Sequence, residues 1–199
     1  GLGDAVRAVA VDALPRGMRT AQGTRLQRAA EFDSSTLTGI HRTTLHRILA
    51  EAAADAEVVT GAQVVRVHPG LRPRVTVVED GEERERVADL VVGADGIDSL
   101  VRAAVRTDLP TDYSGSTCWR GVVARRPDSP AGAMQWFGAG SEAGLVPIDG
   151  DRVYWFVAAR ARMGRTARDE HAAAVDAVRG FEEIVRTHVA ADPETPVLR

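Results

Sequence analysis

The spacing of apolar residues predicts both helices and strands in the first half of the chain. Helical spacing predicts an amphipathic helix from about residue 42 to residue 56, and a short helix is expected over residues 3–10. Alternating positions predict two strands, and an Asp80-Gly81 hairpin turn after the second predicts a return strand whose run of charges would be a solvated face. The helical stripe consists of Leu45, Ile48, Leu49, Ala52 and Ala53, and the expected strands are residues 63–68, 74–79 and 82–87.

A short apolar run, Leu90–Val92, ends at Gly93. Such a run suits a strand that is buried on both faces, as in a parallel sheet. A helix should follow it, with Leu100 and Val101 on its inner face. The sequence therefore predicts a strand, a glycine turn and a helix in succession.

Beyond Pro110 the pattern changes to short strand candidates separated by glycine, proline and aspartate. All three tryptophans lie in this stretch, and one amphipathic helix is expected at its end, over about residues 175–189. We therefore predict an aromatic-rich antiparallel sheet with a helix for residues 109–199, whereas residues 1–108 are expected to be α/β. The strand candidates are residues 118–125, 133–137, 143–148 and 152–159.

Composition and charge argue against several classes of protein. The 199 residues carry 25 basic and 28 acidic side chains, a net charge of −3, which argues against a nucleic-acid-binding protein. No apolar stretch approaches the roughly 18 residues of a membrane span. Cys118 is the one cysteine, so we expect no internal disulfide, no cysteine-based zinc site and a reducing, cytoplasmic compartment. The five histidines show no metal-ligand spacing.

The run Val91–Gly96, followed by Ser99, is the strongest candidate for chemistry. A buried strand, a glycine turn and a helix start would direct free backbone N–H groups at an anion. Asp95 could then orient a ribose or a diphosphate, and Arg102 could pair with a phosphate. The alternative is an ordinary strand-to-helix turn with Asp98 or Ser99 as N-cap, and the spacing leaves both interpretations open.

A second candidate is Arg42, at the start of the clearest predicted helix. A cation at a helix N-terminus opposes the helix dipole, and a negatively charged ligand held there would remove this conflict. The alternative is an exposed arginine that tolerates a cost of about a few tenths of a kcal/mol. The pattern alone does not decide between them.

Together these motifs resemble those of a known family, the single-component FAD-dependent aromatic monooxygenases of the p-hydroxybenzoate hydroxylase type. The branch with salicylate hydroxylase, urate hydroxylase and zeaxanthin epoxidase is the most similar. Val91–Gly96 with Ser99 and Arg102 matches the family's Asp-Gly motif, and Arg42-x-x-Leu45 matches its Arg-x-x-Leu motif. Further matches extend the resemblance over nearly the whole chain: Gly61, Val64, Trp119-Arg120-Gly121, Gly144–Pro147 and Tyr154-Trp155.

The resemblance implies an oxidoreductase with FAD as cofactor and NAD(P)H as cosubstrate. In this family NAD(P)H reduces the flavin, O₂ forms a C4a-hydroperoxyflavin, and its distal oxygen hydroxylates or epoxidises an aromatic or polycyclic small molecule. Because the flavin carries the reaction, we expect no catalytic side chain and no metal site. The protein would be a cytoplasmic flavoprotein without nucleic-acid or membrane partners, and a homodimer stays open.

The resemblance also implies two domains. Residues 1–108 would be an incomplete FAD-binding domain with a parallel sheet, and residues 109–199 a substrate-binding domain. Tyr154 and Trp136 would form part of the substrate wall, although the alternative for such aromatic residues is an ordinary packed core. The implied cofactor contacts are Arg42 to the FAD diphosphate, Val64 to its adenosine, and Asp95 and Arg102 to the two dinucleotides.

Two features of the family are not found in these 199 residues: the N-terminal strand with its G-x-G-x-x-G loop, and a C-terminal Gly-Asp flavin motif. We therefore expect an interior fragment of a longer enzyme that binds FAD poorly and is inactive alone. Two other classes stay open, a non-catalytic small-molecule-binding module and a related flavin dehydrogenase or reductase. An upstream G-x-G-x-x-G loop would exclude the first, and NADH consumption without oxygenation would favour the second.

Overall fold

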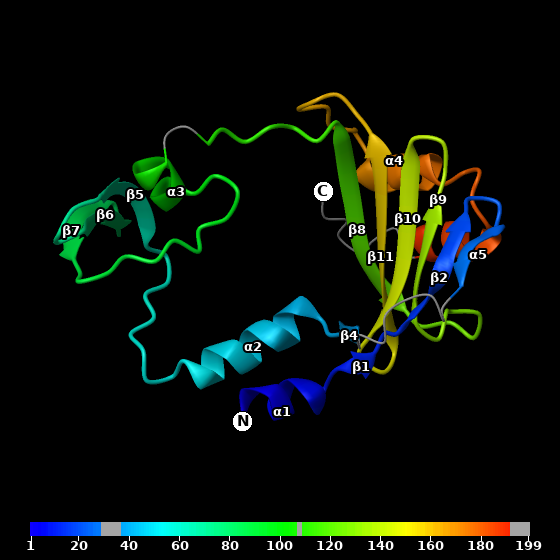
Figure 1. The fold of residues 1–199 in the computed structure, drawn as a ribbon, viewed down its shortest axis with the longest axis horizontal. Coiled ribbons are helices and arrows are strands. Elements are labelled where there is room, and N and C mark those ends of the chain that lie inside the picture. The colour runs from blue at the N-terminus through cyan, green and yellow to red at the C-terminus, as the bar shows by residue number, and fades with distance from the viewer. Residues whose placement is uncertain (29–36, 107–108, 192–199) are drawn as a thin grey trace. The chain divides into compact units, whose positions relative to one another are not determined.

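The computed structural model describes residues 1–28, 37–106 and 109–191. They form two compact units (Figure 1). The larger unit combines Gly1–Ala54 with Ser114–Arg199, and the smaller unit is Asp55–Tyr113. Among the described residues, no helix has both the length and the apolar character that crossing a membrane requires.

The larger unit is built around a mixed six-stranded sheet with the strand order β3–β2–β9–β10–β11–β8. Neighbouring strands are antiparallel, except that β2 runs parallel to β9. The strands predicted beyond residue 110 are confirmed, with bounds that differ by at most two residues. The strands are β2 (Pro15–Thr20), β3 (Arg25–Arg28), β8 (Ser116–Ala124), β9 (Ala133–Phe137), β10 (Ser141–Ile148) and β11 (Arg152–Arg160).

Two helices, α4 (Glu170–Ala177) and α5 (Glu183–Val189), cover one face of this sheet (Figure 1). Side chains alternate between the two faces of a strand, and the positions of β11 that face the helices are almost completely buried. The core between sheet and helices contains Trp119, Trp136, Leu145, Val153, Trp155, Val157, Val178 and Val185.

Two tryptophans attach the helices to the sheet by hydrogen bonds. The indole N–H of Trp119 donates to Glu170 Oε2 at 2.7 Å, and that of Trp136 donates to Glu182 Oε2 at 2.5 Å. Glu170 begins α4 and Glu182 directly precedes α5. Each buried indole therefore has a polar partner at the start of a helix.

The prediction of one C-terminal amphipathic helix is wrong, because the chain turns between α4 and α5. The turn buries the Phe181 side chain in the core. The backbone N–H of Glu182 donates to the carbonyl of Ala21 at 2.7 Å, and Glu182 has an extended conformation. The helical spacing of the apolar residues continues across this break, so the pattern alone did not reveal it.

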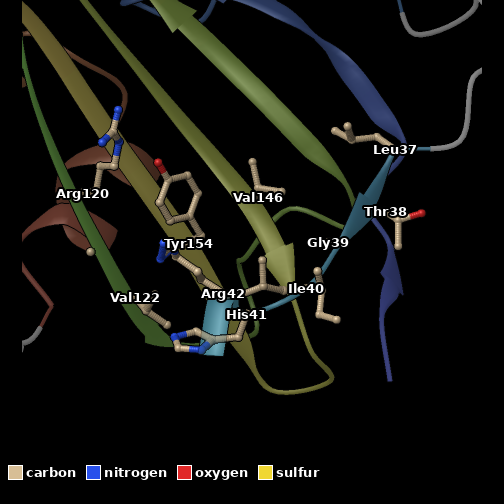
Figure 2. Close-up of a pocket in the computed structure, with 12 residues that line it drawn as sticks. Leu37, Thr38, Gly39, Ile40, His41, Arg42, Arg120, Val122, Val146 and Tyr154 are labelled. Atoms are coloured by element: carbon tan, nitrogen blue, oxygen red, sulfur yellow. The ribbon is translucent and has the colours of Figure 1, made fainter. Parts of the chain in front are cut away.

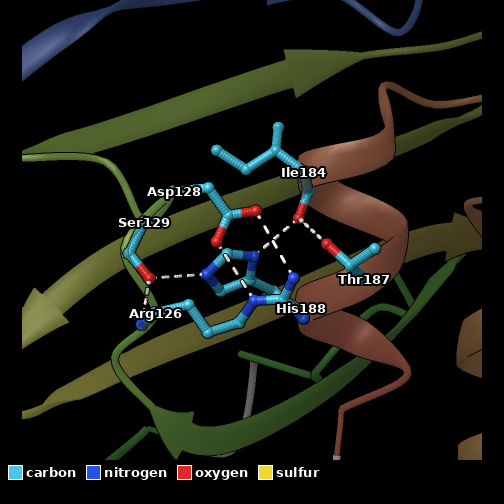
Figure 3. Close-up of polar contacts among 6 residues, drawn as sticks. All are labelled: Arg126, Asp128, Ser129, Ile184, Thr187 and His188. Atoms are coloured by element: carbon cyan, nitrogen blue, oxygen red, sulfur yellow. Dashed lines mark hydrogen bonds and ion pairs between the residues drawn. The ribbon is translucent and has the colours of Figure 1, made fainter.

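A buried histidine joins α5 to the connection between β8 and β9 (Figure 3). The Ile184 carbonyl can only accept a hydrogen bond, so His188 Nδ1, at 2.7 Å from it, carries the ring proton. His188 Nε2 then accepts from the Ser129 hydroxyl, also at 2.7 Å. Ser129 Oγ in turn accepts from the backbone N–H of Arg126 at 2.8 Å. Every polar atom of this imidazole is therefore paired.

The N-terminal part of the larger unit consists of α1 (Leu2–Arg7), β1 (Val11–Asp12), β4 (Thr38–Gly39) and α2 (Arg42–Ala52). Both predicted helices are present, and each ends earlier than predicted. The antiparallel ribbon of β1 and β4 lies directly against β10: a Cβ atom on Gly39 would stand 2.1 Å from the Pro147 carbonyl oxygen. This close approach brings the start of α2 to the end of the large sheet.

The smaller unit contains a three-stranded antiparallel sheet and one short helix. Its strands, β5 (Gln63–His68), β6 (Arg74–Glu79) and β7 (Glu82–Val87), have the predicted bounds. Asp80 and Gly81 both have positive φ angles, of 52° and 82°, as the predicted tight hairpin requires. The helix α3 (Leu100–Val105) is also confirmed.

The predicted strand at Leu90–Val92 is wrong. Residues 90–96 form neither a helix nor a strand, and Leu90 and Val92 are 75% and 77% exposed. A strand buried on both faces needs hydrogen-bonding neighbours, and no described strand pairs with this segment. The parallel pairing that the structure does show, β2 with β9, lies in the larger unit.

The two compact units differ from the predicted division into residues 1–108 and 109–199. Residues 1–54 belong with the large sheet, because β2 pairs with β9 and β4 packs against β10. A compact unit is not the same as a domain of a family, so the domain division stays a prediction. The fold class itself, mixed sheets with helices, is confirmed.

Candidate functional site

The larger unit contains a pocket of about 890 Å³ at the start of α2 (Figure 2). Its volume is in the range of small-molecule sites, which are mostly apolar with a few polar groups. Apolar side chains dominate the lining, and the polar ones from the described residues include two arginines and a histidine but no carboxylate. The pocket is lined by Leu37, Thr38, Gly39, Ile40, His41, Arg42, Arg120, Gly121, Val122, Val146, Ile148 and Tyr154.

The sheet register explains how one wall of the pocket arises. Tyr154 on β11 lies between Val122 on β8 and Val146 on β10 as cross-strand partners. Paired residues share a face of the sheet. This face is opposite to the one that α4 and α5 cover, since the next residue, Trp155, lies in the core. The other wall comes from β4 and the first residues of α2.

Arg42 is the first residue of α2, and its side chain is exposed. The preceding residue, His41, is held by two hydrogen bonds, one of its side chain and one of its backbone. Its Nδ1 accepts from the backbone N–H of Thr43, and its backbone N–H donates to Asp149 Oδ1, each at 3.3 Å. Within the described residues the Arg42 guanidinium makes no hydrogen bond or ion pair. The backbone at this point is therefore held while the cation is left available to a ligand.

Tyr154 and Arg120 provide the polar groups of the sheet wall (Figure 2). Burial raises the pKa of the Tyr154 phenol, and the neighbouring Arg120 guanidinium opposes this shift only in part. The phenol therefore stays protonated at neutral pH and can donate a hydrogen bond. Two donors side by side suit an oxygen atom that carries a negative or partial negative charge.

Trp136, the second predicted substrate residue, lies elsewhere. It is 1% exposed, in the core between the sheet and the helices, and it is not among the pocket residues. Its indole N–H donates a hydrogen bond to the Glu182 carboxylate. This placement corresponds to the packed-core alternative.

Asp95 and Arg102 lie together in the smaller unit, where each satisfies the backbone of its own loop and helix. The Asp95 carboxylate accepts from Ser99 Oγ at 2.6 Å and from the backbone N–H of Leu100 at 2.7 Å. Ser99 is the N-cap of α3, accepting from the backbone N–H of Arg102 at 3.0 Å. The Arg102 guanidinium donates to the Ile97 carbonyl. The structure thus contains the capped turn that was the alternative interpretation, and the dinucleotide roles stay predictions.

Removing the Asp95 carboxylate should loosen α3. The hydrogen bond from Ser99 lowers the pKa of Asp95. The stabilising ionised form is therefore fully present above the unfolded value of about 3.9 and is lost as the pH falls through the lower folded value. In Asp95→Ala we expect faster amide hydrogen exchange at Leu100 and Val101. Asp98→Ala leaves this cap intact, and equal acceleration in that variant would contradict the assignment.

Val64 is on β5 of the smaller unit, where its side chain is 41% exposed and opposite Val77 of β6. The structure therefore groups the predicted residues in two sets. Arg42 and Tyr154 line one pocket of the larger unit, and Val64 belongs to the smaller unit with Asp95 and Arg102.

Arg120 is a charged pocket residue to which the sequence analysis assigned no role. The sequence around it could have indicated its role, because Arg120 is the one charged residue of β8 and stands between the buried Trp119 and Gly121. An arginine on the face opposite a core tryptophan indicates that this second face of the sheet can bind a polar or charged group.

Comparison with known proteins gives consistent matches. A family model described as FAD binding domain matches residues 1–195. The chain is 36% identical to aurachin C monooxygenase/isomerase of Stigmatella aurantiaca over 152 residues, covering 75% of this chain and 39% of that protein. It is 32% identical to 2-heptyl-3-hydroxy-4(1H)-quinolone synthase of Pseudomonas aeruginosa over 123 residues, covering 62% and 32%.

The fold is also found among solved structures. HpxO of Klebsiella pneumoniae, complexed with FAD and uric acid, superposes with a TM-score of 0.79 and 22% identity, over 98% of this chain and 53% of that one. This likeness shows a shared fold. The chain spans about a third to two fifths of the length of the two relatives above.

Proposed function

This chain belongs to the FAD binding domain family, and we propose that it forms part of an FAD-dependent monooxygenase. The reaction would hydroxylate or epoxidise an aromatic or polycyclic small molecule, with NAD(P)H as electron donor and O₂ as oxidant. The observation that carries the proposal is the pocket of the larger unit, which Arg42, without a partner among the described residues, shares with Arg120 and Tyr154.

Of the assigned cofactor residues, Arg42 lines the pocket, where its guanidinium fits a phosphate group of FAD. Arginine binds phosphate through several parallel hydrogen bonds, and among the described residues the Arg42 guanidinium has no other partner at the edge of this apolar cavity. FAD supplies the redox and oxygen-transfer chemistry when it is bound. We assign Arg42 to its diphosphate and Val64 to its adenosine, and Asp95 and Arg102 to the dinucleotides.

The protein's own part in the reaction is to bind, orient and exclude water. The apolar side chains of Ile40, Val122 and Val146 would keep water from the reacting atoms. Tyr154 would donate a hydrogen bond to an oxygen of the substrate, and Arg120 would favour the negative charge on that oxygen. The names of the two relatives, an aurachin C monooxygenase and a quinolone synthase, support an aromatic substrate. A cytoplasmic location, inferred from the free thiol of Cys118, and a homodimer are further parts of the proposal.

The sharpest test is Arg42→Ala in a holoenzyme that contains this chain. A hydrogen bond to a charged group is worth about 1.5–3 kcal/mol, so the dissociation constant for FAD should rise roughly 10- to 150-fold. Flavin fluorescence during titration with FAD measures it. Arg47→Ala is the matched control, since Arg47 is on the same helix and pairs with Glu51 at 2.6 Å. Equal FAD affinity in the two variants would refute the assignment of Arg42.

The reaction class needs a separate measurement. The holoenzyme should consume NAD(P)H and O₂ in the presence of an aromatic substrate and release an oxygenated product, detectable by mass spectrometry with ¹⁸O₂. Consumption of NAD(P)H without any oxygenated product would support a flavin reductase or dehydrogenase instead. Failure to bind FAD at all would support a non-catalytic binding module.

A further inference from the structure

The open face of the large sheet continues beyond the pocket into a second row of polar residues. Cys118 precedes Arg120 by two residues on β8, so both side chains lie on one face of the sheet. Cys118 is the cross-strand partner of Ala158 on β11, which is in turn the partner of Glu142 on β10. All of these side chains project from the same face as Tyr154, because each is an even number of residues from a pocket residue on its own strand. The polar surface is thus larger than the pocket lining.

Glu142 is held in place on this face. Its Oε2 accepts a hydrogen bond from Gln135 Nε2 at 3.1 Å, and its side chain is half-buried. No ion pair joins it to an arginine in the described part of the chain, although Arg120 is near enough for both charges to act on the Cys118 thiol. One oxygen of a fixed carboxylate is therefore left to accept a further hydrogen bond.

Beside Arg120 the same face carries two aromatic rings: Phe156 is the cross-strand partner of Arg120, on the side toward Glu142, and Tyr154 is one row further from Glu142. The rings of Tyr154 and Phe156 have centroids 6.3 Å apart, and Phe156 lies over Gly144, where a Cβ atom would stand 2.1 Å from the ring. Arg120 and Glu142 are on strands separated by β11 and are offset by two residues in register, so their backbones are roughly 12 Å apart. That separation leaves space for an aromatic ring between the two side chains.

We propose that Glu142 determines substrate specificity by accepting a hydrogen bond from an N–H group of a flat aromatic substrate, while Arg120 and Tyr154 donate to an oxygen of the same molecule. The proposal deepens the function proposed above and rests on it. The substrate class is then an aromatic or heteroaromatic ring with an oxygen at one edge and an N–H donor at another.

The physical argument is one of matching donors and acceptors. A carboxylate has only acceptor capacity and a guanidinium only donor capacity. A ligand that leaves either without a partner loses affinity, because buried polar groups are costly when unpaired. A purely anionic aromatic acid would place its negative charge beside Glu142, whereas a ring with both groups satisfies the two ends of the face at once.

A pair of ligands that differ in one N–H group tests this directly. Ligand-observed NMR would measure the affinity of the full chain, without FAD, for 4(1H)-quinolone and for 1-methyl-4(1H)-quinolone. Both have the ring oxygen, and only the first has the N–H donor. We expect at least fivefold tighter binding of the first, and a ratio near one in Glu142→Leu. Glu183→Leu, an exposed position at the start of α5, is the control and should keep the wild-type ratio.

Three outcomes would overturn the proposal: equal affinity of the wild type for both compounds, a preference that persists in a folded Glu142→Leu, or no binding of either compound. Because the assay contains no FAD, it is independent of the Arg42 titration. A normal FAD result with no N–H preference would remove Glu142 as a specificity residue and leave the monooxygenase assignment intact. A clear N–H preference in a protein that never binds FAD would support Glu142 as a specificity residue and refute the monooxygenase assignment.

Discussion

Replacing Trp136 with alanine should lower the free energy of unfolding by about 3–5 kcal/mol, the usual cost of deleting a large buried aromatic side chain. The side chain is almost completely buried in the core under α5. Its removal also leaves the Glu182 carboxylate without the indole N–H that it accepts from. Since a domain of this size is stable by only about 5–15 kcal/mol in total, the variant should be close to unfolding at 37 °C.

Chemical denaturation of the purified chain measures this loss. Trp136→Phe is the informative second variant, since it keeps most of the ring volume and loses the indole N–H, and we expect an intermediate effect. The result also decides between the two interpretations of Trp136. A variant of wild-type stability with impaired ligand binding would make it a substrate residue after all.

Gly39→Ala should have the second large effect. The new methyl group would stand 2.1 Å from the Pro147 carbonyl oxygen, and a backbone atom cannot turn away as a side chain can. The ribbon of β1 and β4 must then move off β10, at a cost of about 2–3 kcal/mol by analogy with overpacked cores. Gly39 also lines the pocket, so ligand affinity should fall together with stability.

Thermal unfolding and FAD titration of the same samples would reveal whether the two effects are coupled. Gly150→Ala is the matched control, because nothing lies within 4 Å of a Cβ atom at that position and its φ angle is not in the left-handed region. An unchanged melting temperature for Gly39→Ala would mean that the ribbon is not seated on β10 as described.

Local patterns predicted the local parts of the fold. The three strands of the smaller unit could be placed to the residue, because residues 63–68 and 74–79 alternate and Asp80-Gly81 specifies a tight turn from which β7 returns. The failures occurred where long-range contacts decide. Leu90–Val92 reads as a buried strand, yet burial depends on neighbours that a single segment does not encode. The break between α4 and α5 depends on a hydrogen bond from Glu182 to the distant Ala21.

The candidate site shows the same division. Arg42 and Tyr154 could each be singled out from their surroundings, but nothing in the sequence places residues so far apart in one pocket. Arg42 and Tyr154 line the same pocket because the ribbon of β1 and β4 packs against β10. That Arg120 and Glu142 project from the same face as Tyr154 follows from the strand register.

The parallel pairing of β2 with β9 has a consequence for how the protein is made. Met18 is paired with Gln135, so a ribosome adding 5–20 residues per second finishes the second strand roughly 6–25 s after the first. During that interval β2 has no partner of its own sheet except β3, and its open edge is exposed to other nascent chains. Pro15, Arg16 and Arg19 interrupt the apolar character of this strand, as residues that discourage aggregation commonly do. Translation speed between β2 and β9 is therefore a variable that should affect the yield of the folded protein.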